Sequence, residues 1–309
     1  MSPYPFAEAK SFMELMGNNI NLPSRDTWFS VQQHPQLIDI SRLILVSPVL
    51  NDAVSAASQN GPMVGGTEDN PLVMPDSVQF PVFRDFCGWF LLLNGVLDHE
   101  LDLSQLENIL EMSHYWSVDI GQAFAADRLA SSPDLSPSYR MMLARRYHIH
   151  HWVDALTVEL FNLPYSEITG LEVVQCSTDV WAVINKARDG YRDALNVLAV
   201  VPPSLPKETN HSFMPYCPNH KACIREWELV WYSKIGRRLL IKDKDHLEPI
   251  GVMEHVTSLS FPQMGRECRR DALELLQSNP NVFNIKHNVE QAAIDGVRAA
   301  LGLPILSMT

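Results

Sequence analysis

Four side chains in the last third of the chain are of the types that bind transition metals. Cys217, His220 and Cys223 lie close together, and Cys268 follows much later. Thiolate and imidazole groups at such spacing can converge on a tetrahedral zinc ion. However, the spacing is not that of a standard zinc knuckle and lacks a second close pair, and free cysteines also serve as small buried hydrophobic residues. We therefore expect structural cysteines with no bound metal or cofactor, and keep a metal-binding or catalytic region centred on residues 217–268 as the alternative.

A second group of candidate ligands is a run of histidines. His148, His150 and His151 precede Trp152, and imidazoles so close together could ligate a metal or respond to pH. The helical phase of the apolar residues turns Ile149 and Trp152 inward. We therefore expect these histidines to be solvated or to cap a helix.

Paired carboxylates suitable for acid–base catalysis occur at Asp98, Glu100 and Asp102. They precede a predicted capping box formed by Ser104 and Glu107, so we expect a solvated turn at the start of a helix. The sequence contains none of the patterns G-x-S-x-G, G-x-G-x-x-G, G-x-x-x-x-G-K-[ST] and H-E-x-x-H. We therefore expect no enzymatic activity and assign no catalytic, cofactor-binding or metal-binding residue.

The seven tryptophans raise the alternative of an aromatic ligand cage. Most of them fall on or beside apolar helical phases, which favours core packing. These are Trp89, Trp152, Trp181, Trp227 and Trp231. Only Trp28 and Trp116 lie outside clear helical patterns.

Composition describes a folded, acidic protein. Hydrophobic residues make up 46% and charged residues 19%, a globular balance. The 36 acidic and 24 basic residues give a formal charge of −12, which argues against nucleic-acid partners. No apolar run approaches the length of a membrane span, so no membrane association is expected. An odd number of irregularly spaced cysteines and no visible secretory signal in residues 1–10 favour a cytoplasmic or nuclear location.

Periodicity predicts a small α/β unit followed by helices. Residues 27–40 carry β-forming residues on both sides of a turn signal at His34-Pro35, which predicts a β-hairpin, and residues 72–74 form a brief strand. From residue 76 the apolar residues follow a helical period, including a stripe that contains Phe83, Phe86 and Phe90. Residues 43–50 have helical spacing, but Pro48 makes any helix there short or broken. Another helix is predicted to begin at Ser104. Further predicted helices cover residues 81–92, 117–130, 137–147, 150–162, 169–198, 223–235, 263–278 and 285–301. Prolines in residues 201–219 predict a linker.

Several segments resemble the BTB/POZ family, in particular its fungal members. Residues 37–50 are similar to the family's strand followed by a helix, and residues 70–78 to its short strand and turn before a helix that matches residues 83–92. Residues 101–130 and 139–158 resemble consecutive helical segments of the fungal proteins. The resemblance covers residues 27–302. It implies protein–protein recognition, with a cullin-type ligase among the partners that the family suggests.

We therefore expect an α+β protein with a small BTB/POZ-like unit and an all-helical extension. The predicted parts are an N-terminal arm (1–26), the BTB/POZ-like domain (27–131), a BACK-like helical extension (132–200), the linker (201–219) and a C-terminal helical region (220–309). The expected function is that of a non-enzymatic scaffold or adaptor that binds other proteins. Because the arm is apolar enough to cover a bare sheet edge at residues 27–31, we expect a monomer or weak homodimer.

Overall fold

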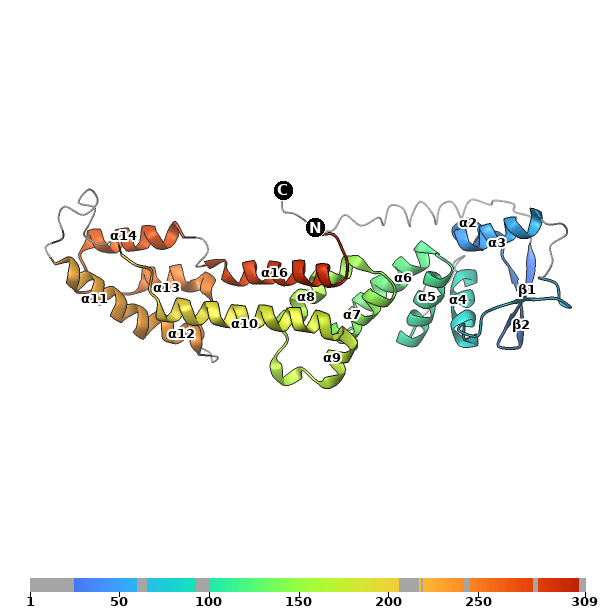
Figure 1. Cartoon of the computed structure of the whole chain (residues 1–309), viewed down its shortest axis with the longest axis horizontal. Coiled ribbons are helices and arrows are strands. Elements are labelled where there is room, and N and C mark those ends of the chain that lie inside the picture. Colours follow the sequence, from blue (N-terminus) through green and yellow to red (C-terminus); the bar gives the residue numbers. More distant parts are fainter. Residues whose placement is uncertain are drawn as a thin grey trace. The chain divides into compact units, whose positions relative to one another are not determined.

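The chain is mostly helical with a small sheet near its N-terminus, which confirms the α+β class (Figure 1). The computed structural model describes residues 25–59, 66–92, 101–205, 217, 219–241, 245–279 and 283–305. Most of the predicted N-terminal arm and most of the predicted linker lie outside these residues. Among the described residues, no helix is both long and apolar enough to cross a lipid bilayer.

The chain divides into two compact units. The first contains residues 1–136 and 143–149, and the second contains residues 137–142 and 150–309. The five-part division drawn from the sequence stays a prediction.

A hairpin forms the centre of the sheet in the first unit. Strands β1 (Asp26–Val31) and β2 (His34–Asp39) are antiparallel, and β3 (Leu72–Val73) pairs in parallel with β1, so the described sheet has the order β2-β1-β3. The hairpin prediction is confirmed, but the predicted turn is wrong. Gln32 and Gln33 turn the chain with φ of 49° and 68°, the combination a two-residue hairpin loop requires.

The expected location of the bare sheet edge is also wrong. Strand β1 lies between β2 and β3, and Pro35 belongs to β2, where it pairs with Ser30. Proline is tolerated there because β2 is an edge strand of the described sheet and does not need every N–H for pairing. The edges that need protection are therefore β2 and β3 rather than residues 27–31.

Helices supply most of the first core, and Phe29 of β1 packs against Phe83 and Trp116. These helices are α2 (Ser41–Val46), α3 (Pro48–Gln59), α4 (Phe80–Leu92), α5 (Leu103–Tyr115) and α6 (Asp119–Ala130). Phe86 of the predicted stripe is fully buried. Its ring lies 5.3 Å from that of Trp116, edge to face, and Trp116 also contacts Phe83 at 5.6 Å. The Ser47 hydroxyl donates to the Trp116 carbonyl at 2.6 Å, which fixes the end of α5 beside α3.

Helix α5 begins earlier than the sequence predicted. Asp102 is its N-cap, accepting from the Gln105 amide at 2.8 Å, while the Gln105 side chain accepts from the Asp102 amide at 3.1 Å. The prediction of Ser104 and Glu107 as the capping pair is therefore wrong. Aspartate caps a helix as well as serine does, so the earlier start is favoured and extends the helix.

In the described part of the second unit, all the regular secondary structure is helical. From residue 137 onward the chain forms α7 (Pro137–Arg146), η1 (His150–Trp152), α8 (Val153–Asn162), η2 (Tyr165–Glu167), α9 (Gly170–Cys176), α10 (Thr178–Val200), α11 (His220–Val230), the π-helical η3 (Trp231–Gly236), α12 (Arg237–Leu240), η4 (Pro249–Gly251), α13 (Val252–Ser258), α14 (Arg266–Gln277) and α16 (Ile285–Ala300). Helix α7 contributes residues to both units.

The long helix predicted at 169–198 is two helices. The predicted capping box of Thr169 and Glu172 is confirmed at the start of α9. Ser177 then breaks the helix with a φ of 78°, and its hydroxyl accepts from the Val180 amide to begin α10. Ser177 can do this because a short hydroxyl side chain replaces a lost backbone partner.

Helix α10 runs beside α16, which also packs against α8 (Figure 1). Arg298 of α16 holds Asp154 of α8 by two parallel hydrogen bonds of 2.7 and 2.8 Å. Among the described residues 185–197 of α10, none is fully buried. The two ends of α10 therefore pack into different groups of side chains.

The C-terminal end of α10 is held by tryptophans. The Trp231 indole donates to the Leu198 carbonyl at 2.9 Å, and the Trp227 indole donates to the Pro203 carbonyl at 2.9 Å. The last carbonyls of a helix have no partner within the helix, so the Trp231 bond satisfies one of them. Gly236 allows the π-helical segment to approach, because a Cβ there would lie 2.3 Å from the Ala199 carbonyl oxygen. This packing fixes α11, whose first turn carries part of the site described next.

Candidate functional site

The first turns of α11 and α14 bring the cysteines and the histidine together. His220 is the first residue of α11 and Cys223 lies in the same turn, while Cys217 precedes the helix. Cys268 lies in the first turn of α14. Asn219 fixes the start of α11, because its side chain accepts from the Ala222 amide at 3.3 Å.

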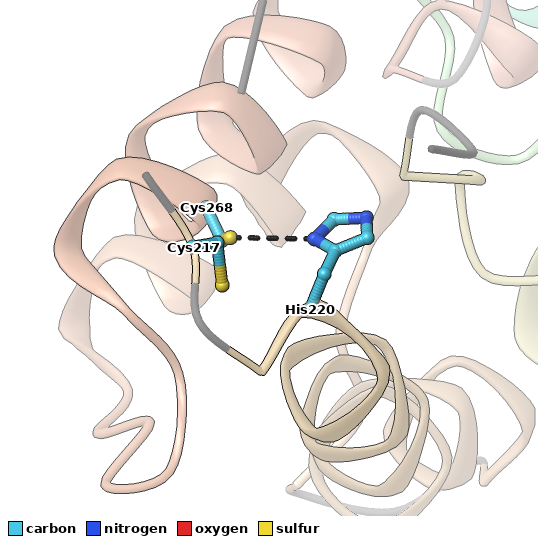
Figure 2. A group of neighbouring side chains, drawn as sticks. All are labelled: Cys217, His220 and Cys268. Carbon is cyan, nitrogen blue, oxygen red and sulfur yellow. Dashed lines mark hydrogen bonds between the residues drawn. The ribbon is translucent and has the colours of Figure 1, made fainter. Parts of the chain in front are cut away.

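These four side chains, which we call the Cys/His cluster, lie next to one another, and three of them are close enough to share one ligand. The sulfurs of Cys217 and Cys223 are 3.5 Å apart. The Cys268 sulfur is 3.5 Å from Nδ1 of His220 (Figure 2). The ligand atoms of Cys217, His220 and Cys268 all lie within 4.8 Å of one another. Cys223, His220 and Cys268 are buried, and Cys217 is half-buried.

The surroundings of the Cys/His cluster combine apolar packing with backbone donors. Cys223 and Cys268 belong to the buried core that includes Trp227 and Trp231. The amide of Gly265, the residue before α14, donates to the Cys223 sulfur at 3.4 Å. Burial and hydrogen bonds with Cys217 and Cys223 raise the pKa of the Cys268 thiol well above its usual range.

The other sequence candidates do not form a site of this kind. His148, His150 and His151 are exposed, whereas Ile149 and Trp152 are buried, which confirms the predicted inward phase. Asp102 caps α5. Asp98 and Glu100 lie outside the described residues.

The predicted role of the tryptophans is confirmed. All five assigned to the core are buried: Trp89, Trp152, Trp181, Trp227 and Trp231. Trp116, which showed no clear pattern in the sequence, is buried as well and is central to the first core. It follows α5 directly, and its position depends on a chain reversal that helical periodicity does not reveal.

The first unit also contains hydrogen bonds around His114 and Tyr147 that the sequence does not predict. The side-chain amide nitrogen of Gln122 donates to Nδ1 of His114 at 3.0 Å, and burial together with His148 and Arg146 lowers the pKa of His114. The Tyr147 hydroxyl donates to Glu111 at 3.3 Å. These partners come from different helices and share no sequence motif, so only the fold brings them together.

Comparison of this chain with protein-family models, with curated proteins and with solved structures gives no match.

Proposed function

We propose that this chain is a non-enzymatic protein-interaction module, with a BTB/POZ-like first unit and a helical extension, that serves as a scaffold or adaptor. The observation that carries the proposal is the type of element formed by each segment that resembles the family. Residues 37–50 contain the end of β2, all of α2 and the start of α3, and residues 70–78 contain β3. Residues 83–92 lie in α4, and residues 101–130 form α5 and α6. Strands and helices thus fall where the resemblance implies them.

Exposed apolar side chains on both edges of the sheet add support. Leu37 on β2 is 51% exposed and Val73 on β3 is 77% exposed. Edge strands with such residues offer both unpaired backbone groups and apolar contact to a partner. The proposal includes a cytoplasmic or nuclear location, with which the five free cysteines agree.

Affinity capture with the full chain tests this function. We expect specific proteins, with a cullin among the candidates, to be retained from a native extract by the wild type. The variant Leu37→Arg with Val73→Arg should lose them, because both changes add charge to edge strands without disturbing the core. Val174→Arg is the matched control, since Val174 is 75% exposed on α9 in the second unit.

Two results would refute the interaction proposal: no protein retained above a bead control, or a retained set that the sheet-edge variant leaves unchanged. Light scattering over a concentration series measures self-association in the same preparations. A tight homodimer would contradict the expected monomer or weak homodimer.

The second candidate function is a metal-binding or catalytic role centred on residues 217–268. The convergence of the Cys/His cluster favours metal binding, and metal analysis separates it from a role for these cysteines in packing alone.

A further inference from the structure

We propose that Cys217, His220, Cys223 and Cys268 bind one zinc ion as a structural Cys3His site. The inference reverses the preference for ordinary structural cysteines that the sequence alone supported. That preference rested on the missing second close pair, and the fold supplies it by placing Cys268 beside His220. The zinc proposal does not depend on the interaction function proposed above.

The distances agree with tetrahedral zinc coordination. With Zn–S of about 2.3 Å and Zn–N of about 2.0 Å, a regular tetrahedron places two sulfurs about 3.8 Å apart and a sulfur and a nitrogen about 3.5 Å apart. The Cys217–Cys223 and Cys268–His220 distances are both 3.5 Å. Cys217 and Cys223 are both interaction partners of the Cys268 thiol, so the third sulfur lies beside the same pair. Small movements of the side chains are therefore enough to surround an ion.

The local electrostatics suit thiolate ligands. Three thiolates and a neutral imidazole around Zn²⁺ carry a net charge of one negative unit. The first turns of α11 and α14 both meet at the Cys/His cluster, so two helix N-termini direct partial positive charge at it. The Gly265 amide adds a donor to the Cys223 sulfur, as outer-shell groups commonly do in metal sites.

Zinc binding would deprotonate the three cysteines, because a bound Zn²⁺ deprotonates coordinating thiols. Binding then releases three protons to solvent, one from each thiol, and changes no oxidation state.

The donor set assigns the ion a structural rather than a catalytic role. Structural zinc sites have four protein ligands, whereas catalytic sites keep one position for water or substrate. The Cys/His cluster provides four ligands, three of them buried. The ion would tie the start of α11 to the start of α14 across the core that contains Trp227 and Trp231.

Metal analysis of the full chain is the direct test. Protein purified under reducing conditions without added metal should contain close to one zinc ion per chain, measured by inductively coupled plasma mass spectrometry. Replacing zinc with cobalt should give visible d–d bands and thiolate-to-cobalt charge transfer, which report sulfur ligands in a tetrahedral field. This spectrum needs no variant and therefore does not depend on the stability of a mutant.

Paired cysteine variants locate the ion. Cys268→Ser should weaken zinc binding by more than the roughly 10- to 100-fold that loss of an outer-shell partner costs. Cys176→Ser is the matched control, because Cys176 is fully buried in the second unit and lies outside the Cys/His cluster. The control should retain stoichiometric zinc and the cobalt spectrum.

Chelation should expose the link between metal and fold. A strong chelator should lower the melting temperature of helices α11 and α14 in the wild type, and zinc should restore it. The proposal would be overturned if the purified wild type contains no zinc and its melting temperature changes neither with added zinc nor with the chelator. A cobalt spectrum without thiolate charge transfer, or zinc lost equally from Cys176→Ser and Cys268→Ser, would do the same.

Discussion

Replacing Phe86 with aspartate should unfold the first unit at neutral pH. Phe86 is fully buried in α4 and packs against Trp89, Phe90 and Trp116. The substitution removes a ring from the centre of this aromatic group. It also places a carboxylate among the rings of Trp89, Phe90 and Trp116.

The size of the effect follows from two contributions to the free energy of unfolding. Loss of a buried phenylalanine costs about 3–5 kcal/mol in truncation series. Burial raises a carboxyl pKa by up to about 3–5 units, and each unit corresponds to about 1.4 kcal/mol. At about pH 7 the carboxylate therefore adds about 4 kcal/mol to the loss, since its unfolded pKa is about 3.9. The sum of about 7–9 kcal/mol equals most or all of the stability of a typical domain.

The contribution of the charge has a characteristic pH dependence. The folded-state pKa of Asp at position 86 is raised above its unfolded value, so the variant is least destabilised below about pH 4. Stability is then lost as the pH rises from the unfolded pKa towards the folded one. Phe86→Asn is the matched control, because its amide resembles the protonated carboxyl group and does not titrate in this range.

Hydrogen exchange of the full-length chain, followed by mass spectrometry of peptides from α4 and α5 across a urea series, measures the stability of this unit. We expect the urea midpoints of the Asp and Asn variants to agree near pH 4 and to separate as the pH rises, with Phe86→Leu close to the wild type. Wild-type protection in Phe86→Asp at neutral pH would refute the placement of Phe86 in the core. A pH-independent difference between the Asp and Asn variants would refute the burial of the charge.

Two further changes test the packing of each unit. Gly236→Ala should destabilise the second unit by about 3 kcal/mol in urea unfolding, because its Cβ would lie 2.3 Å from the Ala199 carbonyl oxygen. The control is Gly190→Ala on α10, where a Cβ meets no atom within 4 Å, and this change should be neutral or stabilising. Equal effects of the two changes would contradict the close approach at Gly236. The pKa of His114 is lowered by burial, so the wild type should lose stability as pH falls below about 6.5, the unfolded value. His114→Gln should reduce that loss in thermal melts at about pH 7.5 and 5, and an NMR titration of His114 with a pKa above 6.5 would contradict the argument.

Periodicity predicted most helices of the fold because their buried faces repeat at helical spacing. The stripe through Phe83, Phe86 and Phe90 became α4, and the β-forming residues after residue 27 became the hairpin. What the sequence did not reveal were breaks set by single residues. Ser177 adopts a positive φ inside an apolar pattern that continues on both sides, and Asp102 competes with Ser104 as a cap. Such choices depend on small local differences in free energy that patterns of hydrophobicity do not contain.

The candidate site was predictable in its residues and not in its assembly. The spacing of Cys217, His220 and Cys223 identifies them as candidate ligands, since a loop and one helical turn hold them near each other. Cys268 comes from a different helix, and its approach depends on how α11 and α14 pack. This packing depends on core side chains such as Trp227. Their positions in the sequence do not indicate that Cys268 lies beside the other three residues.

The middle of α10, where no side chain is fully buried, has a consequence for how the second unit melts. One end of this helix is held by the side chains around Trp181 and the other by the Trp231 indole, while residues 185–197 contribute no fully buried side chain. A stretch of this kind transmits little cooperativity, because most helical stability comes from packing rather than from the helix itself. The two ends should therefore behave as separate foldons, and calorimetry of the second unit should show a van't Hoff enthalpy below the calorimetric enthalpy.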